Sequence, residues 1–174
     1  MRFLFVLAFV SLWYSNPAPL PKPAPNTLTW VPIYANASTA RKVSYLPPRP
    51  IVTSGKIYAI GNYLLQVEKD SGIHVIDYSN RATPQKLGFI RSVMCSEMAV
   101  KGQYLYINNI DDLVVLNISN MSNPVEVSRL TKAFTYDAGT YPVNGWGFFE
   151  CPDPSKGVVI GWKRESRDYP QCYR

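Results

Sequence analysis

Two segments of this chain, each about forty residues long, repeat one another, and this repeat limits the possible folds more than any other feature. The apolar run Ile73–Asp77 is matched 40 residues later by Leu113–Asn117. Turn residues recur at the same spacing: Ser79, Asn80 and Pro84 follow the first run, and Ser119, Asn120 and Pro124 follow the second. A period of about 40 residues, with turn residues between short apolar runs, is typical of β-propeller blades.

Each repeat contains short apolar runs with turn residues at every join. In the first repeat the runs cover residues 56–60, 63–67, 73–76 and 86–90. Their Val, Ile and Tyr content favours strands. We therefore predict an all-β fold, a partial β-propeller with two four-stranded antiparallel blades at residues 55–90 and 95–130. Asp77 and Asn117 are expected to accept backbone N–H groups in the following turn, and the two prolines to begin the outer strand.

The repeated residues resemble the LVIVD-repeat family, through Ile73–Asp77, Leu113–Asn117 and the Ser-Asn pair and proline that follow each. This resemblance covers about residues 55–130 and is expected to extend into the tail that contains Trp146, Cys151, Lys156, Gly157 and Trp162. It implies a bacterial, extracytoplasmic protein whose repeats form a β-propeller. Family members usually carry more repeats, and two blades cannot close a ring that needs at least about four. We therefore expect a short or truncated member, or a chain that completes its sheets by association, for example as a homo-oligomer.

The third strand of each repeat is apolar at nearly every position, as expected for a strand covered on both faces. We expect the two blades to pack face to face, because one small sheet cannot bury both of its faces alone. The residues expected at this contact are Ile73, Val75, Val115 and Ile118. The outward faces would then be covered by residues 131–174, by residues 28–50 or by another chain.

Residues 1–16 have the pattern of a signal peptide. Arg2 precedes about a dozen apolar residues, and a proline-rich segment follows. The apolar stretch is shorter than the roughly 20 residues that a membrane-spanning helix needs. We therefore predict export, with a secreted, periplasmic or cell-envelope location. An uncleaved segment, either amphipathic or buried, is the alternative.

Residues 17–54 hold nine of the fifteen prolines and predict an extended, Pro-rich linker. The linker carries four basic residues and no acidic one, whereas residues 55–174 carry 13 basic and 12 acidic residues. A nearly neutral fold does not suit nucleic-acid binding, which needs a dense basic patch. The basic linker could make a weak contact with an anionic surface, or serve only to keep the chain soluble.

Residues 131–174 are expected to cap the blades with a β-hairpin that includes the glycine-bounded stretch 157–161. Such a hairpin would bring Cys151 and Cys172 together, so we predict a disulfide between them. The third cysteine, Cys95, begins an apolar strand and is expected to be a buried free thiol. Trp146 and Phe148 lie beside glycines in the same segment, and they either contact a ligand such as a sugar ring or pack in the core.

The sequence contains no recognisable cofactor motif, and we expect no cofactor. His74, the only histidine, lies in an apolar strand and is expected to pack in the core rather than to act as a base. Asp111 and Asp112 could bind Ca²⁺, but a spaced set of oxygen ligands is missing, so solvated turn acids are favoured.

The expected function is that of a non-enzymatic binding or scaffold module with a protein or glycan ligand at the cell surface, since blades present short loops on a rigid scaffold. One alternative is an extracellular hydrolase whose site is completed by other blades or another chain. The other alternative is a fragment of a longer propeller without an independent role.

Overall fold

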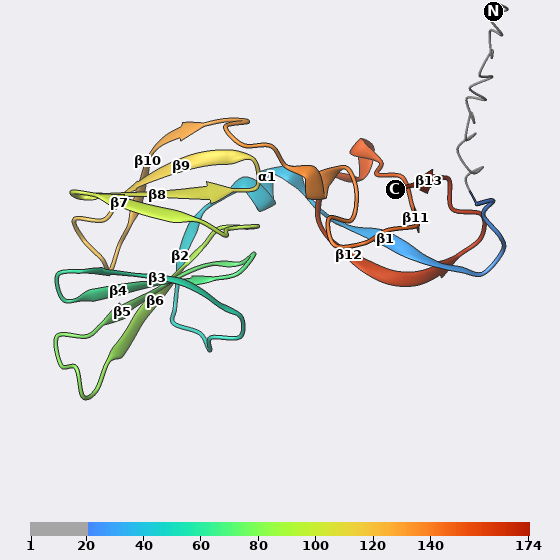
Figure 1. The fold of residues 1–174 in the computed structure, drawn as a ribbon. Helices are drawn as coiled ribbons and strands as arrows, with labels where there is room; N and C mark the ends of the chain where they lie inside the picture. The colour runs from blue at the N-terminus through green and yellow to red at the C-terminus, as the bar shows by residue number, and fades with distance from the viewer. Residues whose placement is uncertain (1–20) are drawn as a thin grey trace, which may run out of the picture.

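The computed structural model describes residues 21–174, whose strands form three separate sheets (Figure 1). The predicted signal peptide lies outside the described residues. Only short helical turns accompany the strands: α1 (Ala37–Arg41), η1 (Asp137–Gly139) and η2 (Pro154–Lys156). Within residues 21–174, no helix is long and apolar enough to cross a membrane. The all-β class predicted from the repeat is confirmed.

The first repeat folds as an antiparallel sheet, which we call blade 1. Its strands from the inner to the outer edge are β3 (Ser54–Ile60), β4 (Tyr63–Glu68), β5 (Gly72–Asp77) and β6 (Gln85–Arg91). A fifth strand, β2 (Ser44–Leu46), lies antiparallel along the outer edge of β6, with Tyr45 opposite Ile90. Gly88 makes this close approach possible, because a Cβ at that position would lie 2.2 Å from the Tyr45 ring.

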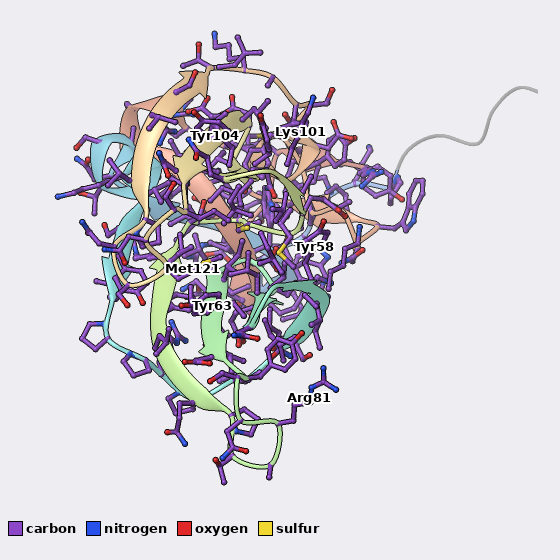
Figure 2. The ribbon with its side chains drawn as sticks, turned by 90° about the vertical axis from the view of Figure 1, so that its left-hand side faces the viewer. Tyr58, Tyr63, Arg81, Lys101, Tyr104 and Met121 are labelled. Atoms are coloured by element: carbon purple, nitrogen blue, oxygen red, sulfur yellow. A yellow bond between two sulfur atoms is a disulfide. The ribbon has the colours of Figure 1, made fainter. Side chains whose placement is uncertain are left out.

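The second repeat forms blade 2. Its strands are β7 (Met98–Lys101), β8 (Tyr104–Asn109), β9 (Asp112–Asn117) and β10 (Val125–Leu130). In both blades a two-residue turn joins the first two strands and begins with a glycine at positive φ, Gly61 at 55° and Gly102 at 58°. Glycine adopts this conformation without steric cost, as tight hairpins require. Tyr63 and Tyr104 follow these turns at equivalent positions (Figure 2).

The third sheet joins residues that precede the repeats to residues that follow them. Its strand order is β12 (Val158–Arg167), β1 (Thr27–Ala35), β11 (Phe148–Phe149) and β13 (Cys172–Tyr173). The structure differs here from the sequence-based expectation. Part of the predicted linker is a strand, β1, and residues 158–167 pair with β1 over its whole length instead of folding back on their neighbours. The antiparallel pair within the C-terminal segment is formed by β11 and β13.

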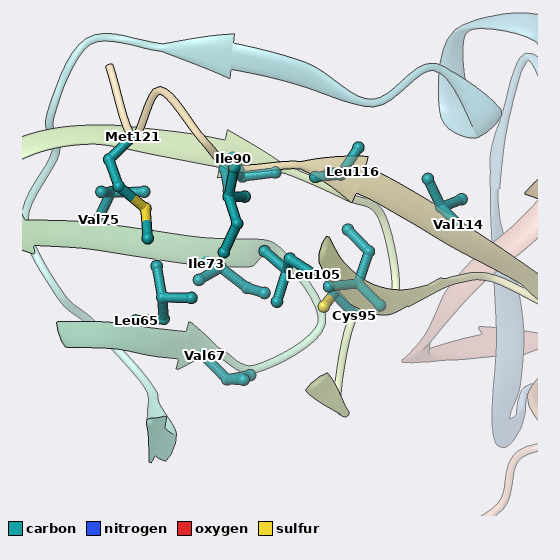
Figure 3. Packing of buried hydrophobic residues seen from close by; sticks show 12 residues of the cluster. Leu65, Val67, Ile73, Val75, Ile90, Cys95, Leu105, Val114, Leu116 and Met121 are labelled. Atoms are coloured by element: carbon teal, nitrogen blue, oxygen red, sulfur yellow. The ribbon is translucent and has the colours of Figure 1, made fainter. Parts of the chain in front are cut away.

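The main core lies between the two blades (Figure 3). Successive side chains of a strand point to opposite faces, so each blade has a front face, on the side of Ile73 or of its equivalent Leu113, and a back face. The front of blade 1 packs against the back of blade 2. The buried residues at this contact include Leu65, Val67, Ile73, Val75 and Ile90 from blade 1, and Leu105, Ile107, Val114 and Leu116 from blade 2.

Face-to-face packing of the blades is therefore confirmed, and Ile73, Val75 and Ile118 lie in the shared core as expected. The expectation for Val115 is wrong, because that side chain is on the front face of blade 2 and points away from blade 1. A strand that is apolar at every position does not reveal which of its faces turns inward, and here Val114 and Leu116 do so.

The back face of blade 1 is covered by residues 49–53, which we call the cap segment. The backbone N–H groups of Val52 and Thr53 donate hydrogen bonds to the carboxylate of Glu68. The Arg49 guanidinium lies 4.9 Å from the centre of the Phe89 ring, a cation–π contact. The cover expected from residues 28–50 is thus met only in part on blade 1, because just residues 49 and 50 of the cap segment fall within that range.

Candidate binding site

A pocket of about 280 Å³ opens where loops of the two blades meet. The β4–β5 turn supplies Asp70, and the β8–β9 turn supplies Ile110. The link between the blades supplies Met94, Ser96 and Glu97. Residues 134–136, which follow blade 2, complete the wall. The pocket is therefore built from both repeats and from the segment that leaves them, so it requires the blades to be stacked.

Backbone hydrogen bonds hold the pocket wall in place. The N–H of Asp70 donates to the Cys95 carbonyl, and the N–H of Met94 donates to the Asp70 carbonyl, both at 2.9 Å. The side chain of Asn108 then ties down the rest of the link. Its Oδ1 accepts the N–H groups of Ser96 and Glu97 at 2.9 and 3.0 Å, and its Nδ2 donates to the Met94 carbonyl at 2.7 Å. With its backbone groups paired in this way, the wall is preorganised.

Three residues of the wall have backbone conformations that side chains other than glycine rarely adopt. Asp70, Met94 and Ile110 have φ values of 61°, 59° and 60°. The conformation is most unfavourable for Ile110, because its side chain is branched at Cβ. Strained backbone of this kind concentrates at functional sites, where the surrounding structure holds it.

The charged groups that line the pocket are carboxylates. Asp70 and Glu97 are the only charged residues of its wall, and Glu97 also pairs with the exposed Lys56 on its outer side. Burial raises the pKa of Tyr136 to about 12, and the negative charges of Asp70 and Asp111 contribute to the same shift. The Tyr136 hydroxyl therefore stays neutral and donates a hydrogen bond of 2.8 Å to the Val159 carbonyl. The pocket combines an aromatic wall with a negative rim.

His74 and Glu68 form a buried pair on the back face of blade 1. Both side chains are almost completely inaccessible, with relative exposures of 0% and 2%. Burial alone would raise the pKa of Glu68, but the N–H groups of Thr53 and Val52 and the nearby His74 outweigh it, so that the pKa is lowered. His74 is a packed histidine, as expected, and substrate cannot reach it while the cap segment is in place.

Asp111 and Asp112 do not form the solvated acidic turn that the sequence suggested. Asp112 is fully buried, and its carboxylate lies 2.8 Å from the guanidinium groups of both Arg41 and Arg129. Burial would raise the pKa of Asp112, but these partners and the N–H of Lys132 lower it. Asp111 also pairs with Arg41 at 2.6 Å. The correction has a simple cause: the two cations come from α1 and β10, far from the turn in sequence.

The repeated turn residues have the same role in both blades. Asp77 Oδ1 accepts the N–H of Ser79 at 2.8 Å, and Asn117 Oδ1 accepts the N–H of Ser119 at 2.9 Å. Three residues after Asp77 and Asn117, Asn80 and Asn120 accept the N–H groups of Ala82 and Ser122. Pro84 and Pro124 directly precede β6 and β10. These residues shape the turn and lie apart from the pocket.

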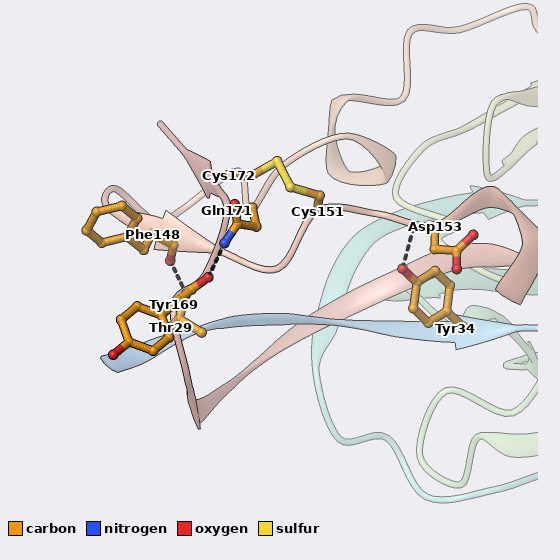
Figure 4. Close-up of a disulfide and its surroundings, with 8 residues drawn as sticks. All are labelled: Thr29, Tyr34, Phe148, Cys151, Asp153, Tyr169, Gln171 and Cys172. Atoms are coloured by element: carbon orange, nitrogen blue, oxygen red, sulfur yellow. Dashed lines mark hydrogen bonds between the residues drawn. A yellow bond between two sulfur atoms is a disulfide. The ribbon is translucent and has the colours of Figure 1, made fainter. Parts of the chain in front are cut away.

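Cys151 and Cys172 form a disulfide within the third sheet (Figure 4). Cys151 lies two residues after the end of β11, and Cys172 lies in β13. These two strands pair with each other, and Phe149 is opposite Cys172. Cys95 is the free, buried cysteine, and burial raises the pKa of its thiol to about 12. Cys95 is therefore inert as a nucleophile at neutral pH.

The two aromatic residues considered for ligand contact have different surroundings. Trp146 has 80% of its surface exposed, so it does not pack in the core. The Arg174 guanidinium lies 5.3 Å from the centre of its ring and 3.9 Å from that of Tyr141. Phe148 is half-buried and packs edge-on against Tyr173. Neither residue lines the pocket between the blades.

None of the residues that line the pocket was singled out as a site residue from the sequence, and Asn108 and Tyr136 illustrate why. The repeat could have pointed to Asn108, which stands 41 residues after Val67. At this position the second repeat has an amide where the first has a buried apolar residue. Tyr136 lies outside the repeats and had no such signal. Among residues 21–174, no group of three or more His, Cys, Asp or Glu side chains is placed to hold a metal ion.

The stacked blades and their repeated turns define the class: this is a repeat protein with propeller-type units. The family model for the LVIVD repeat matches residues 53–90 and 94–132. The chain thus contains two LVIVD repeats, as its sequence indicated. No curated protein and no solved structure matches it.

Proposed function

We propose that this chain is an exported, non-enzymatic LVIVD-repeat module that binds a basic side chain of a protein partner in the pocket between its blades. The observation that carries the proposal is that Asp70, from the β4–β5 turn, and Glu97, from the link between the blades, both line a preorganised pocket. A Lys or Arg side chain suits such a pocket, because its aliphatic stem can lie on Phe134 and Tyr136 while its charge meets the carboxylates.

Export is supported by two independent features. The first residues have the pattern of a signal peptide, and Cys151 and Cys172 are paired in a disulfide, which persists in oxidising compartments. The non-enzymatic part of the proposal is supported by the burial of His74 under the cap segment, which keeps the only histidine of the chain away from solvent.

Binding can be tested with a tetra-arginine peptide and backbone amide NMR of the purified chain. We expect shifts at residues 70, 94–97 and 108, and an affinity in the millimolar to micromolar range that falls as salt increases. Asp70→Asn and Glu97→Gln should each weaken binding several-fold. Asp137→Asn is the matched control, because Asp137 is an exposed acid that does not line the pocket. Equal weakening by all three variants, or no shifts at these residues, would disprove the site.

Glycan binding at Trp146 is a second candidate, favoured by the 80% exposure of its ring. A flat exposed indole offers a stacking surface for a sugar. Soluble oligosaccharides should then change the tryptophan fluorescence of the chain, and Trp146→Ala should abolish the change. Trp162→Phe is the control, because the Trp162 indole donates a hydrogen bond to the Ala138 carbonyl and is only partly exposed. A response that survives Trp146→Ala would exclude this site.

A further inference from the structure

The two blades bury their front faces to very different extents. On blade 1, Leu65, Ile73, Val75 and Ile90 have relative exposures of 0–1% because blade 2 covers them. The equivalent residues of blade 2, by the 40- or 41-residue offset of the repeat, are Tyr106, Leu113, Val115 and Leu130. These are half-buried or exposed. The repeat therefore contains the same interface twice, but only one copy is occupied within residues 21–174.

The register of the strands shows which side chains share this front face. Val125, Asn117, Tyr104 and Lys101 form one row across blade 2. The next row contains Ser128, Val115, Tyr106 and Ala99, and the third contains Leu130, Leu113 and Asn108. Tyr104, Val125 and Leu130 keep 36%, 51% and 61% of their surface exposed. Lys101 is the only charged side chain of these rows. It borders a shallow hollow of about 480 Å³ with Tyr104, and both residues are labelled in Figure 2.

This composition is that of an interface rather than of a solvated sheet. Tyrosine is enriched and charge is depleted at the centre of protein–protein contacts. Four strands about 4.8 Å apart and three rows about 6.7 Å apart give a patch on the order of 400 Å². Apolar patches of this size on a monomer often mark interaction sites.

The cap segment limits how a second copy could cover the patch. Head-to-tail stacking would need the back face of blade 1, which carries Gln66, Glu68 and His74 and is closed by residues 49–53. Opening it would leave the buried Glu68 carboxylate without two of its hydrogen-bond donors, at a large cost. Within residues 21–174 the front of blade 2 has no such cover, so the same face of another copy is the self-complementary surface that remains accessible.

We propose that the front face of blade 2 binds the front face of blade 2 in a second copy of this chain, across a two-fold axis. Such an isologous contact closes on itself, so it yields a dimer and not a filament. Burying about 400 Å² on each side, about 800 Å² in total, is less than stable specific interfaces bury and is the size of a weak, transient contact. The dimer is therefore weak, and its population depends on concentration.

Sedimentation velocity of the purified chain over a concentration series of roughly 5–500 μM tests the proposal. We expect a monomer–dimer equilibrium, at least about tenfold weaker in Leu130→Glu and in Tyr104→Glu, which lie on different strands. Leu28→Glu is the matched control: Leu28 is 57% exposed but lies on the third sheet, so dimerisation should be unchanged. Thermal melting checks that each variant is folded.

Chemical crosslinking gives a second measurement that does not depend on destabilising variants. Val115 lies near the centre of the patch, and packed sheets are about 10 Å apart. Val115→Cys should therefore be crosslinked to its copy by a short bifunctional maleimide, whereas Leu28→Cys should not. The buried Cys95 does not compete. Three results would each overturn the proposal. The first is a monomer at every concentration, and the second is a dimer unaffected by Leu130→Glu and Tyr104→Glu. The third is head-to-tail oligomers that form only when the cap segment is removed.

Discussion

His74 Nε2 lies 3.0 Å from Glu68 Oε2, and both side chains are sealed beneath the cap segment. Glu68 thus accepts from His74 on one side and from the backbone of Val52 and Thr53 on the other. The pair consequently joins the segment that precedes the repeats to the middle strands of blade 1. Its role is to fasten the cap, which keeps the back face of that blade closed.

Replacement of Glu68 by Gln should destabilise the chain by about 2–3 kcal/mol, because a buried charge-assisted hydrogen-bond network loses its acceptor charge. Urea unfolding at neutral pH measures this. Glu97→Gln is the control, since Glu97 forms an exposed pair with Lys56 and should change stability by less than about 0.5 kcal/mol. Similar effects of the two substitutions would mean that Glu68 does not anchor the cap segment.

Stability should fall as the pH is lowered below about 4. The pKa values of Glu68 and Asp112 are lowered in the folded chain, whereas in the unfolded chain they are about 4.3 and 3.9. The unfolded state then binds more protons in this window, so both groups stabilise the fold above pH 4 and cease to do so as the pH falls through their folded pKa values. Urea midpoints at several pH values should show this slope.

The variant Asp112→Asn isolates one of these two groups. It should lower stability at neutral pH by about 2–4 kcal/mol, because Arg41 and Arg129 lose their shared buried partner. It should also flatten the acid slope. If the variant has the same stability and the same dependence of stability on pH as the wild type, the assignment of Asp112 to this network is contradicted.

Removal of the disulfide by Cys151→Ser together with Cys172→Ser should cost about 3 kcal/mol in the third sheet, as expected for a loop of 21 residues. Non-reduced peptide mapping by mass spectrometry should find the Cys151–Cys172 bond and a free Cys95. A crosslinked peptide that contains Cys95 would contradict the pairing.

Export should remove residues 1 to about 15–18, since Arg2 and the apolar stretch after it have the pattern of a signal peptide. N-terminal sequencing of the mature protein measures the position of cleavage. Met1 retained in exported material would contradict this prediction.

The repeat allowed the blades to be predicted because their contacts are local in sequence. Each of β3–β6 and β7–β10 pairs with its neighbour along the chain, and tight turns at Gly61 and Gly102 mark the joins. The turn chemistry of Asp77 and Asn117 followed from the same spacing. The pattern did not show which face of a strand is buried. Val115 and Val114 are equally apolar, and only the stacking of blade 2 on blade 1 decides which of them is buried.

The elements that were missed depend on distant partners. Asp112 is buried because Arg41 and Arg129 converge on it, and neither is its neighbour in sequence. Similarly, the proline-rich composition around β1 hid a strand whose partner, β12, lies beyond both repeats. The candidate pocket depends both on contacts that are local to a repeat and on contacts with distant segments. Its loops could be located from the repeat, whereas Tyr136 could not.

The pairing of β1 with β12 also determines the order in which the chain can fold. During synthesis about 120 residues must follow Ala35 before its partner Val158 exists, which takes on the order of ten seconds. Both blades are complete in sequence before that moment, whereas β1 has no strand to pair with. Contacts between such distant residues form slowly, because a long loop must close first. The third sheet is therefore the late-assembling part of the fold, and closure of its disulfide reports that folding is finished.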